Sequence, residues 1–426
     1  MLDRTIAPAF RAIKALEFVQ PESITYGNGL QAFVFKDSNL ELVKFEFVFQ
    51  NIFENGKSPL QNSMLSAMLK EGTSNLSSAQ IAEKVDYYGA FLMPEYSFDH
   101  TSLTVYTMHK YAASVLPIVR DILQYASIPQ EELDTHTRNN KQNLQISLKK
   151  NDVLARRMFY TFVFGDNQYG TVPELTDFDA IQREDILQLY HKQINPKNCT
   201  LFISGKVDSA LLEVVAQNFA TGWEGSTAVS SVNPIQLNDQ AGTFKLTRKE
   251  DALQSAIRMG GLSINRTHPD YPAVQFVNTL LGGFFGSRLM RNIREEKGYT
   301  YSIGSAVANL KHTGFFTLAS EVGVDVTQAT LDEIEKEFNI LRTEKAHTEE
   351  VNLVRNYMQG SLLGSLESIF SHADKFKAVY LADMDLSYYQ HYSTIIDQMD
   401  ADRVYAIANQ YFDYDKLVKV VVGKLG

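Results

Sequence analysis

The stretch GGFFGSRLMRNIREEKGYTYSIG, residues 282–304, contains the side chains whose types and spacing could do chemistry. Arg294 and Tyr301 lie seven residues apart, on either side of a Lys297-Gly298 pair that ends a predicted helix. A guanidinium and a phenol both donate hydrogen bonds, which suits a carbonyl oxygen that gains negative charge during a reaction. The pair is therefore a candidate for binding a peptide carbonyl.

The glycines before this helix allow two interpretations. Gly282, Gly283 and Gly286 would let a peptide backbone approach closely, so they are candidate substrate-binding positions. They could equally end one helix before Ser287 caps the next, which would leave Arg294 as a solvated residue near a helix C-terminus. Local chemistry alone leaves both interpretations open.

Other common catalytic patterns are missing from the sequence. None of the nine histidines forms an HExxH, HxxEH or HxxH pair, and the single cysteine, Cys199, excludes a zinc site built on several cysteines. The chain has no GxxxxGK[ST] loop and no GxSxG turn, which argues against a P-loop NTPase and an α/β-hydrolase. Cys199 stands in an apolar run and is predicted to be a buried, inert thiol.

Bulk composition narrows the class of partner. The 426 residues carry a formal net charge of −10, which is unfavourable for binding nucleic acid through its phosphates. No run approaches the roughly 18 apolar residues of a membrane span, and MLDRTIAPAF does not look like a signal peptide. We expect a cytoplasmic protein with no nucleic-acid or membrane partner.

The second half of the chain repeats the first. Ile181 and Met399, Ile186 and Val404, and Glu132 and Glu350 stand in similar local sequences, and each pair is 218 residues apart. LFISGKV and KVVVGKL match at the same offset. One offset over some 70 residues indicates a tandem duplication of a long unit.

The order of elements predicts the fold class. Strands with period-two alternation and amphipathic helices are mixed in each half, without the strict alternation of a doubly wound fold. We therefore predict two homologous α+β domains, each with an antiparallel-rich mixed sheet packed with helices. The predicted boundaries are 1–221 for the first domain, 222–242 for a Gly/Ser/Asn/Gln-rich linker and 243–426 for the second domain.

At this point the chain resembles the pitrilysin, insulin-degrading enzyme and mitochondrial processing peptidase family, whose active members carry HxxEH. LLGGFFGSRLMRNIREEKGYTYSIG is similar to the signature of the family's second domain, and Arg294 and Tyr301 fall on its arginine and tyrosine positions. HPDYPAVQFVNTLLGG and FGDNQYG also resemble family segments. The resemblance covers nearly the whole chain and agrees with the tandem duplication.

The first domain departs from the family pattern. MLKEGT, residues 68–73, matches the stretch that follows HxxEH in active members, which places Ser63 and Ala67 at the two zinc-histidine positions and Ser66 at the general-base glutamate. The third ligand position falls near Asn143. Serine, alanine and asparagine do not replace histidine and glutamate in a catalytic zinc site. The resemblance thus implies no metal or other cofactor in this chain, and zinc only in a partner.

The bacterial branch of the family pairs an HxxEH-bearing chain with a related chain that lacks it. The resemblance implies that this protein is such a non-catalytic subunit, inactive alone. It would close the chamber and supply Arg294 and Tyr301 to peptide or unfolded polypeptide at the partner's zinc site.

Two further hypotheses stay open at this stage. The chain could be a non-proteolytic peptide-binding or scaffold protein of the same fold, possibly homodimeric. It could also be an independent peptidase with a displaced metal site, for which His100 and His109 are close enough in sequence to be considered.

Overall fold

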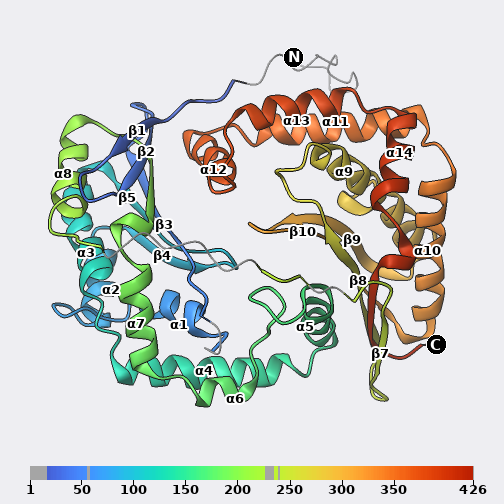
Figure 1. Ribbon diagram of the computed structural model, residues 1–426, viewed down its shortest axis with the longest axis horizontal. Coiled ribbons are helices and arrows are strands. Elements are labelled where there is room, and N and C mark those ends of the chain that lie inside the picture. The colour runs from blue at the N-terminus through green and yellow to red at the C-terminus, as the bar shows by residue number, and fades with distance from the viewer. Residues whose placement is uncertain (1–16, 55–57, 226–234, 238–239, 426) are drawn as a thin grey trace, which may run out of the picture.

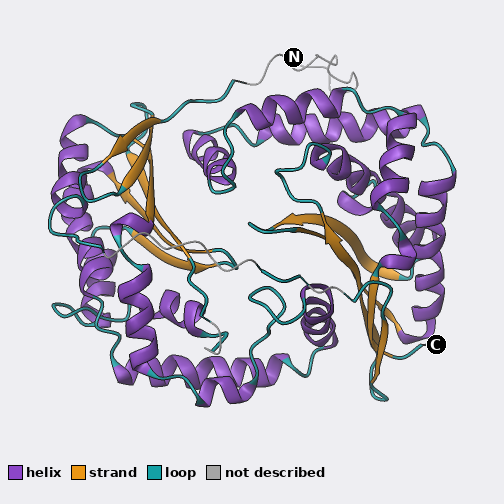
Figure 2. Cartoon of the chain, in the orientation of Figure 1, coloured by secondary structure: helices purple, strands orange, loops and turns teal. Residues whose placement is uncertain are grey.

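The computed structural model describes residues 17–54, 58–225, 235–237 and 240–425, and these form two separate mixed sheets flanked by helices (Figures 1 and 2). The first sheet has six strands in the order β1-β2-β6-β3-β5-β4, and the second has five in the order β7-β11-β8-β10-β9. The strands are β1 Glu22–Thr25, β2 Gln31–Lys36, β3 Leu42–Gln50, β4 Phe91–Tyr96, β5 His100–Met108, β6 Cys199–Gly205, β7 Phe244–Arg248, β8 Gln254–Ser263, β9 Thr300–Asn309, β10 Gly314–Gly323 and β11 Val418–Gly423.

Fourteen α-helices are found in the described residues, and most of them lie outside the two sheets in Figure 1. They are α1 Gln61–Met68, α2 Ser78–Tyr87, α3 Ala112–Tyr125, α4 Gln130–Ser147, α5 Asn151–Phe164, α6 Leu175–Asp179, α7 Arg183–Gln193, α8 Ser209–Phe219, α9 Tyr271–Asn278, α10 Thr327–Thr343, α11 Thr348–Gly364, α12 Ile369–Tyr380, α13 Ser387–Asp397 and α14 Ala401–Tyr411. Two π-helical segments, Thr279–Gly283 and Met290–Glu296, lie between α9 and β9.

The predicted α+β class is confirmed, and each sheet is mixed but mostly antiparallel. The β2–β6 and β11–β7 pairs are parallel, while β3 and β8 are each antiparallel to both of their neighbours. Residues 43–49 of β3 are buried on both faces, and one of these faces carries the charged side chains of Lys44 and Glu46. In β3 the side chains Val43, Phe45, Phe47 and Phe49 share one face and belong to the core of the first half, as their alternation predicts.

The structure also shows the duplication. Helices α7 and α14 are 218 residues apart at both ends, from Arg183 to Ala401 and from Gln193 to Tyr411. Strands β6 and β11 end at Gly205 and Gly423, which are 218 residues apart as well. The offset found in the sequence is therefore the offset between equivalent elements of two similar folding units.

The two halves exchange one helix each. Helix α5 of the first half packs on β8 and β11 of the second sheet, where Phe159 and Val163 contribute to one apolar cluster with strand residues of that sheet. Helix α12 of the second half packs on β6 and β2 of the first sheet and places Phe376 against Phe33. Because Asn151 and Ile369, the first residues of the two helices, are 218 residues apart, the exchange is reciprocal.

The exchanged helices mean that each predicted domain covers part of the other domain's sheet. The first sheet is built from residues 22–205 and the second from residues 244–423, but α5 and α12 each cover the other half's sheet. Residues 226–234 and 238–239 of the predicted linker lie outside the described residues. The boundaries at 221 and 243 stay a prediction.

Polar contacts also fasten α12 to the first sheet. Lys44 Nζ lies 3.0 Å from Glu46 Oε2 and 2.9 Å from Asp374 Oδ1, and Lys377 Nζ lies 2.5 Å from Glu46 Oε1. Burial by itself would lower the pKa of Lys44, but Glu46 and Asp374 more than offset this effect and raise it. A buried charge left without its partner would be costly, so this network favours one position of α12 on the sheet.

Candidate functional site

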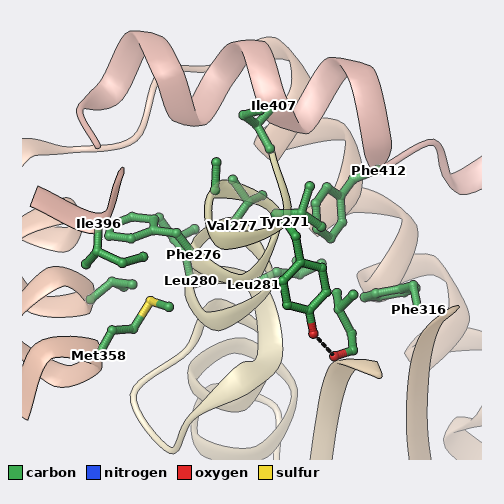
Figure 3. Packing of buried hydrophobic residues seen from close by; sticks show 14 of the residues in the cluster. Tyr271, Phe276, Val277, Leu280, Leu281, Phe316, Met358, Ile396, Ile407 and Phe412 are labelled. Atoms are coloured by element: carbon green, nitrogen blue, oxygen red, sulfur yellow. Dashed lines mark hydrogen bonds between the residues drawn. The ribbon is translucent and has the colours of Figure 1, made fainter. Parts of the chain in front are cut away.

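The candidate site begins with a helix that is anchored in the core of the second half. Val277, Leu280 and Leu281, on α9 and the π-helical turn after it, are all at most 1% exposed (Figure 3). At the start of α9 the Tyr271 hydroxyl donates a hydrogen bond to the Val307 carbonyl oxygen of β9, 3.3 Å away. The core thus fixes the backbone that leads into the glycine turn.

A second helical segment carries Arg294 and is held by neighbours on two sides. Arg288 makes two hydrogen bonds to Glu350 of α11, from Nε to Oε1 at 2.8 Å and from Nη2 to Oε2 at 2.7 Å. Asn292 Nδ2 donates to Glu337 Oε1 at 2.7 Å and to Glu333 Oε2 at 3.0 Å, both on α10. These contacts set the position of the segment and therefore the direction of Arg294.

Arg288 is not among the site residues predicted from the sequence. Its side chain is only 8% exposed, and although burial alone would lower its pKa, the hydrogen bonds and charge of Glu350 raise it. The two residues are 62 positions apart, so no local pattern links them. One local signal did exist. Arg288 stands next to the buried Leu289, whereas Arg291 lies on the exposed face of the same segment, so the sequence could have suggested that Arg288 is buried.

The structure brings Arg294 and Tyr301 together, as their spacing predicts. Gly298 has a φ of +67°, which reverses the chain between the helical segment and β9. Arg294 Nε then donates to the Tyr301 carbonyl oxygen at 3.0 Å, and its guanidinium carbon lies 5.9 Å from the centre of the Tyr301 ring. The guanidinium carbon also lies 4.6 Å from the Phe285 ring centre, so two aromatic rings frame the cation.

The two side chains differ in their exposure to solvent. Tyr301 is 91% exposed, and Phe285 beside it is 63% exposed, whereas the Arg294 side chain is 28% exposed. One guanidinium nitrogen is already used by the Tyr301 carbonyl, and Glu295 approaches a second at 3.9 Å. The phenol and the rest of the guanidinium stand at the surface as donors that an incoming carbonyl group could meet.

Close packing explains why glycine stands at these three positions. A Cβ at Gly282 would lie 2.5 Å from Ser305 Oγ of β9 and 2.8 Å from Leu289 Cδ1, so only glycine lets the turn pack against this strand. At Gly283 a Cβ would lie 3.1 Å from Asn278 Nδ2, and at Gly286 it would meet the Phe284 ring at 2.8 Å. A role of these glycines in substrate binding stays a prediction.

The positions predicted for a lost zinc site lie on α1 and α4. Ser63 Oγ donates to the Leu60 carbonyl oxygen at 2.9 Å, Ser66 is buried at 4% exposure, and Ala67 is half-buried. Asn143 is exposed on α4. Two hydroxyls, a methyl group and an amide do not fit a catalytic zinc ion. Within the described ranges, no group of three or more His, Cys, Asp and Glu side chains could hold a metal ion.

The histidines considered for a displaced metal site are far apart. His100 is the first residue of β5 and His109 follows its last residue, so at ~3.3 Å per residue they are separated by roughly 30 Å. His109 Nε2 instead lies 3.1 Å from Asp208 Oδ2. Burial lowers the pKa of His100 to about 4, against the opposing charge of Asp99. The hypothesis of a metal site shared by these two residues is wrong.

Cys199 is buried, as its apolar sequence surroundings predict. It is 4% exposed at the start of β6, and burial raises the pKa of its thiol well above the ordinary value. A buried protonated thiol is a poor nucleophile, so this residue contributes to packing.

Comparison with known proteins shows what the chain is similar to. Residues 180–358 match the family model described as "Peptidase M16 inactive domain". This part of the chain is similar to peptidase M16 inactive domains. The matched region runs from the residues before α7 into α11, and it includes the glycine turn, Arg294 and Tyr301. This confirms the resemblance to the pitrilysin family.

Relatives and a solved structure are similar to the chain over longer stretches. The "Uncharacterized zinc protease YmxG" of Bacillus subtilis is 22% identical over 365 residues, which is 84% of this chain and 87% of that protein. The "Probable inactive metalloprotease YmfF" of the same organism is 23% identical over 46% of each chain. The crystal structure of a peptidase M16 inactive domain from Pseudomonas fluorescens superimposes with a TM-score of 0.87 at 18% identity, covering 95% of this chain and 98% of that one.

None of the described helices is both long enough and apolar enough to cross a bilayer.

Proposed function

We propose that this chain is the non-catalytic subunit of a heterodimeric zinc peptidase, active with an HxxEH-bearing homologue that supplies the zinc site. Its role is to help enclose peptide or unfolded polypeptide and to present Arg294 and Tyr301 to the peptide bond under attack. The observation that carries the proposal is the exposed phenol of Tyr301, 91% accessible, beside a guanidinium that the Tyr301 carbonyl oxygen already orients.

The chemistry of the two side chains follows from their positions. When a peptide carbonyl is attacked, its oxygen gains negative charge, and donors placed beforehand stabilise that charge best. The Tyr301 hydroxyl and the remaining Arg294 N–H groups are such donors. The Arg294 Nε hydrogen bond and the contact with the Phe285 ring hold the guanidinium in place before a peptide arrives.

The experiment mixes this protein with an HxxEH-bearing homologue from the same genome and measures cleavage of a fluorogenic peptide. We expect activity only in the mixture, and we expect Tyr301→Phe and Arg294→Gln each to lower kcat by about tenfold to a thousandfold. Size-exclusion chromatography should show that the two chains still assemble, because neither substitution disturbs the fold.

The chain offers matched controls for both substitutions. Tyr87 is another highly exposed tyrosine, 82% accessible on α2, and Arg291 is an exposed arginine in the same segment as Arg294. Tyr87→Phe and Arg291→Gln should leave kcat at its wild-type value. Full turnover in Tyr301→Phe and Arg294→Gln would overturn the proposed role. Stable peptide binding by a homodimer that no homologue activates would favour the scaffold hypothesis instead.

A further inference from the structure

A pocket of about 330 Å³ lies among α9, α11, α12 and α13, and Tyr301 is not one of its lining residues. Its charged and phenolic lining includes Arg266, Lys375, Tyr271, Tyr388, Tyr389 and Tyr392. Its volume is at the lower end of the range for small-molecule sites, which suits a chain end better than a long segment. The lining contains no carboxylate side chain.

The first cation of the pocket is only partly satisfied. Arg266 Nη1 donates to the Ala378 carbonyl oxygen at 2.5 Å, and the guanidinium carbon lies 5.5 Å from the centre of the Tyr388 ring. Its Nε atom is buried and has no hydrogen-bond partner. A buried guanidinium N–H without an acceptor is costly, so the site favours a ligand that brings one.

The second cation lies nearby. Lys375 Nζ is 5.9 Å from the Tyr389 ring centre, and burial together with the charge of Arg266 lowers the pKa of Lys375, against the opposing charge of Asp374. The Asp374 carboxylate is bound by Lys44 at 2.9 Å and Lys377 at 3.3 Å. Within the part of the chain that the structure describes, neither Arg266 nor Lys375 forms an ion pair with a carboxylate.

The tyrosines do not neutralise these cations. Burial raises the pKa of Tyr389 to about 12 and raises the pKa values of Tyr388 and Tyr392 as well, so all three phenols remain protonated at neutral pH. The Tyr389 hydroxyl donates to the Lys375 carbonyl oxygen at 3.1 Å. Among the described residues, no hydrogen bond is formed by the Tyr388 or Tyr392 hydroxyl, which leaves both free to donate to a ligand.

We infer that this pocket binds a carboxylate group of a peptide, with Arg266 and Lys375 as its counter-charges and the Tyr388 and Tyr392 hydroxyls as further donors. Charge-assisted hydrogen bonds from a guanidinium to a carboxylate are among the stronger polar contacts in proteins. The aromatic walls would cover the apolar atoms next to that group. The inference rests on the proposed function, since it assumes that the chain handles peptides.

The pocket is connected to the candidate site through one aromatic contact. Tyr357 of α11 lines the pocket, and its ring stacks on Phe284 of the glycine turn, with ring centres 4.8 Å apart and an interplanar angle of 30°. Phe284 is followed by Phe285, which frames Arg294. A peptide held in the pocket would therefore lie beside the turn that leads to Arg294 and Tyr301.

The test uses the full chain alone, without an HxxEH partner, and titrates short peptides by calorimetry. The probes are Ala-Ala-Ala-Phe with a free C-terminal carboxylate, the same peptide as its C-terminal amide, and N-acetyl-Ala-Ala-Glu-Phe-amide, whose only carboxylate is a side chain. We expect at least one carboxylate-bearing probe to bind and the uncharged C-terminal amide to bind about tenfold or more weakly. Which acid binds more tightly identifies the source of the carboxylate.

Substitutions then locate the binding. Lys375→Gln should weaken binding of the preferred acid by about tenfold or more, because it removes a cation whose side chain has no hydrogen bond within the described residues. Tyr392→Phe, which keeps the ring, should weaken it less. The control Lys84→Gln changes an exposed lysine on α2 and should bind as the wild type does.

Three outcomes would overturn the inference. The first is that neither acid binds at millimolar concentration. The second is that the acid and the amide bind equally well, and the third is that a folded Lys375→Gln protein keeps the wild-type affinity. The proposed function fails in a different way, because it is tested by cleavage in the mixture. Tyr87→Phe, at an exposed residue that does not line the pocket, should leave this binding intact.

Discussion

The two halves contain the same helix–glycine–strand unit, with different side chains at matching places. In the first half α2 is followed by Gly89, with a φ of +58°, and then by the edge strand β4. In the second half the π-helical segment is followed by Gly298, with a φ of +67°, and then by the edge strand β9. Counted from each glycine, Val85 and Leu92 occupy the places of Arg294 and Tyr301.

The difference shows that the scaffold does not dictate the chemistry. Val85 is 7% exposed and belongs to the core of the first half, and Leu92 packs against that core. Tyr301, at the place of Leu92, is 91% exposed. The first half uses the reversal to bury apolar groups, whereas the second half uses it to present two donors to solvent.

The largest expected effect concerns what holds the second unit in place. Arg288→Ala would leave Glu350 without its partner in a largely buried site, where Arg288 is 8% and Glu350 20% exposed. We expect the free energy of unfolding to fall by about 3–5 kcal/mol, the usual cost of removing one member of a buried pair. Urea unfolding followed by circular dichroism measures this change.

Arg291→Ala is the control, because Arg291 is exposed in the same segment. It should change the free energy of unfolding by no more than about 0.5 kcal/mol. A loss below about 1 kcal/mol in Arg288→Ala would mean that the segment is held mainly by its apolar contacts.

The second effect is a pH dependence that His100 should add to the first half. His100 begins β5, whereas the corresponding strand of the second half, β10, begins with Gly314. Burial lowers the pKa of His100 to about 4, and Lys311 and Lys377 add to this effect while Asp99 opposes it. An unfolded chain protonates this histidine near its ordinary pKa of about 6.5, so it binds a proton that the folded chain does not.

Stability should therefore fall as pH drops from about 7 towards about 4, with at most about 3 kcal/mol due to His100. His100→Gln should flatten this part of the curve when unfolding free energies are measured across the range. The exposed His191 provides the control, since His191→Gln should leave the slope as it is in the wild type. An unchanged slope in His100→Gln would show that other groups dominate the pH dependence.

Much of this architecture could be predicted from local sequence. The alternation in β3 is a short-range pattern, the 218-residue offset follows from aligning the two halves, and the structure confirms both. The proximity of Arg294 and Tyr301 was also predictable, because one glycine reversal separates them.

Long-range features could not be predicted in the same way. An amphipathic helix shows which of its faces is apolar but not which sheet will cover it, so the exchange of α5 and α12 has no local signal. The Arg288–Glu350 pair depends on packing across 62 residues. The π-helical hydrogen bonding before and after the glycine turn likewise follows from tertiary contacts that periodicity does not show.

The smallest expected effect tests the comparison most directly. At Gly89 and Gly298 a Cβ would meet no atom within 4 Å, so Gly→Ala at either place adds only the cost of a left-handed backbone. We expect Gly89→Ala and Gly298→Ala each to lower the free energy of unfolding by about 1 kcal/mol.

Their effects on cleavage by the mixture should nevertheless differ. Gly298→Ala strains the reversal that orients Arg294 and Tyr301, and a small displacement of such donors weakens stabilisation of the developing charge. Gly89→Ala strains a reversal that leads only to Val85 and Leu92. A lower kcat for Gly298→Ala with normal turnover for Gly89→Ala would show that only the second unit contributes to cleavage, although both substitutions cost the same stability. Equal kcat values would mean that the second unit is a packing device like the first.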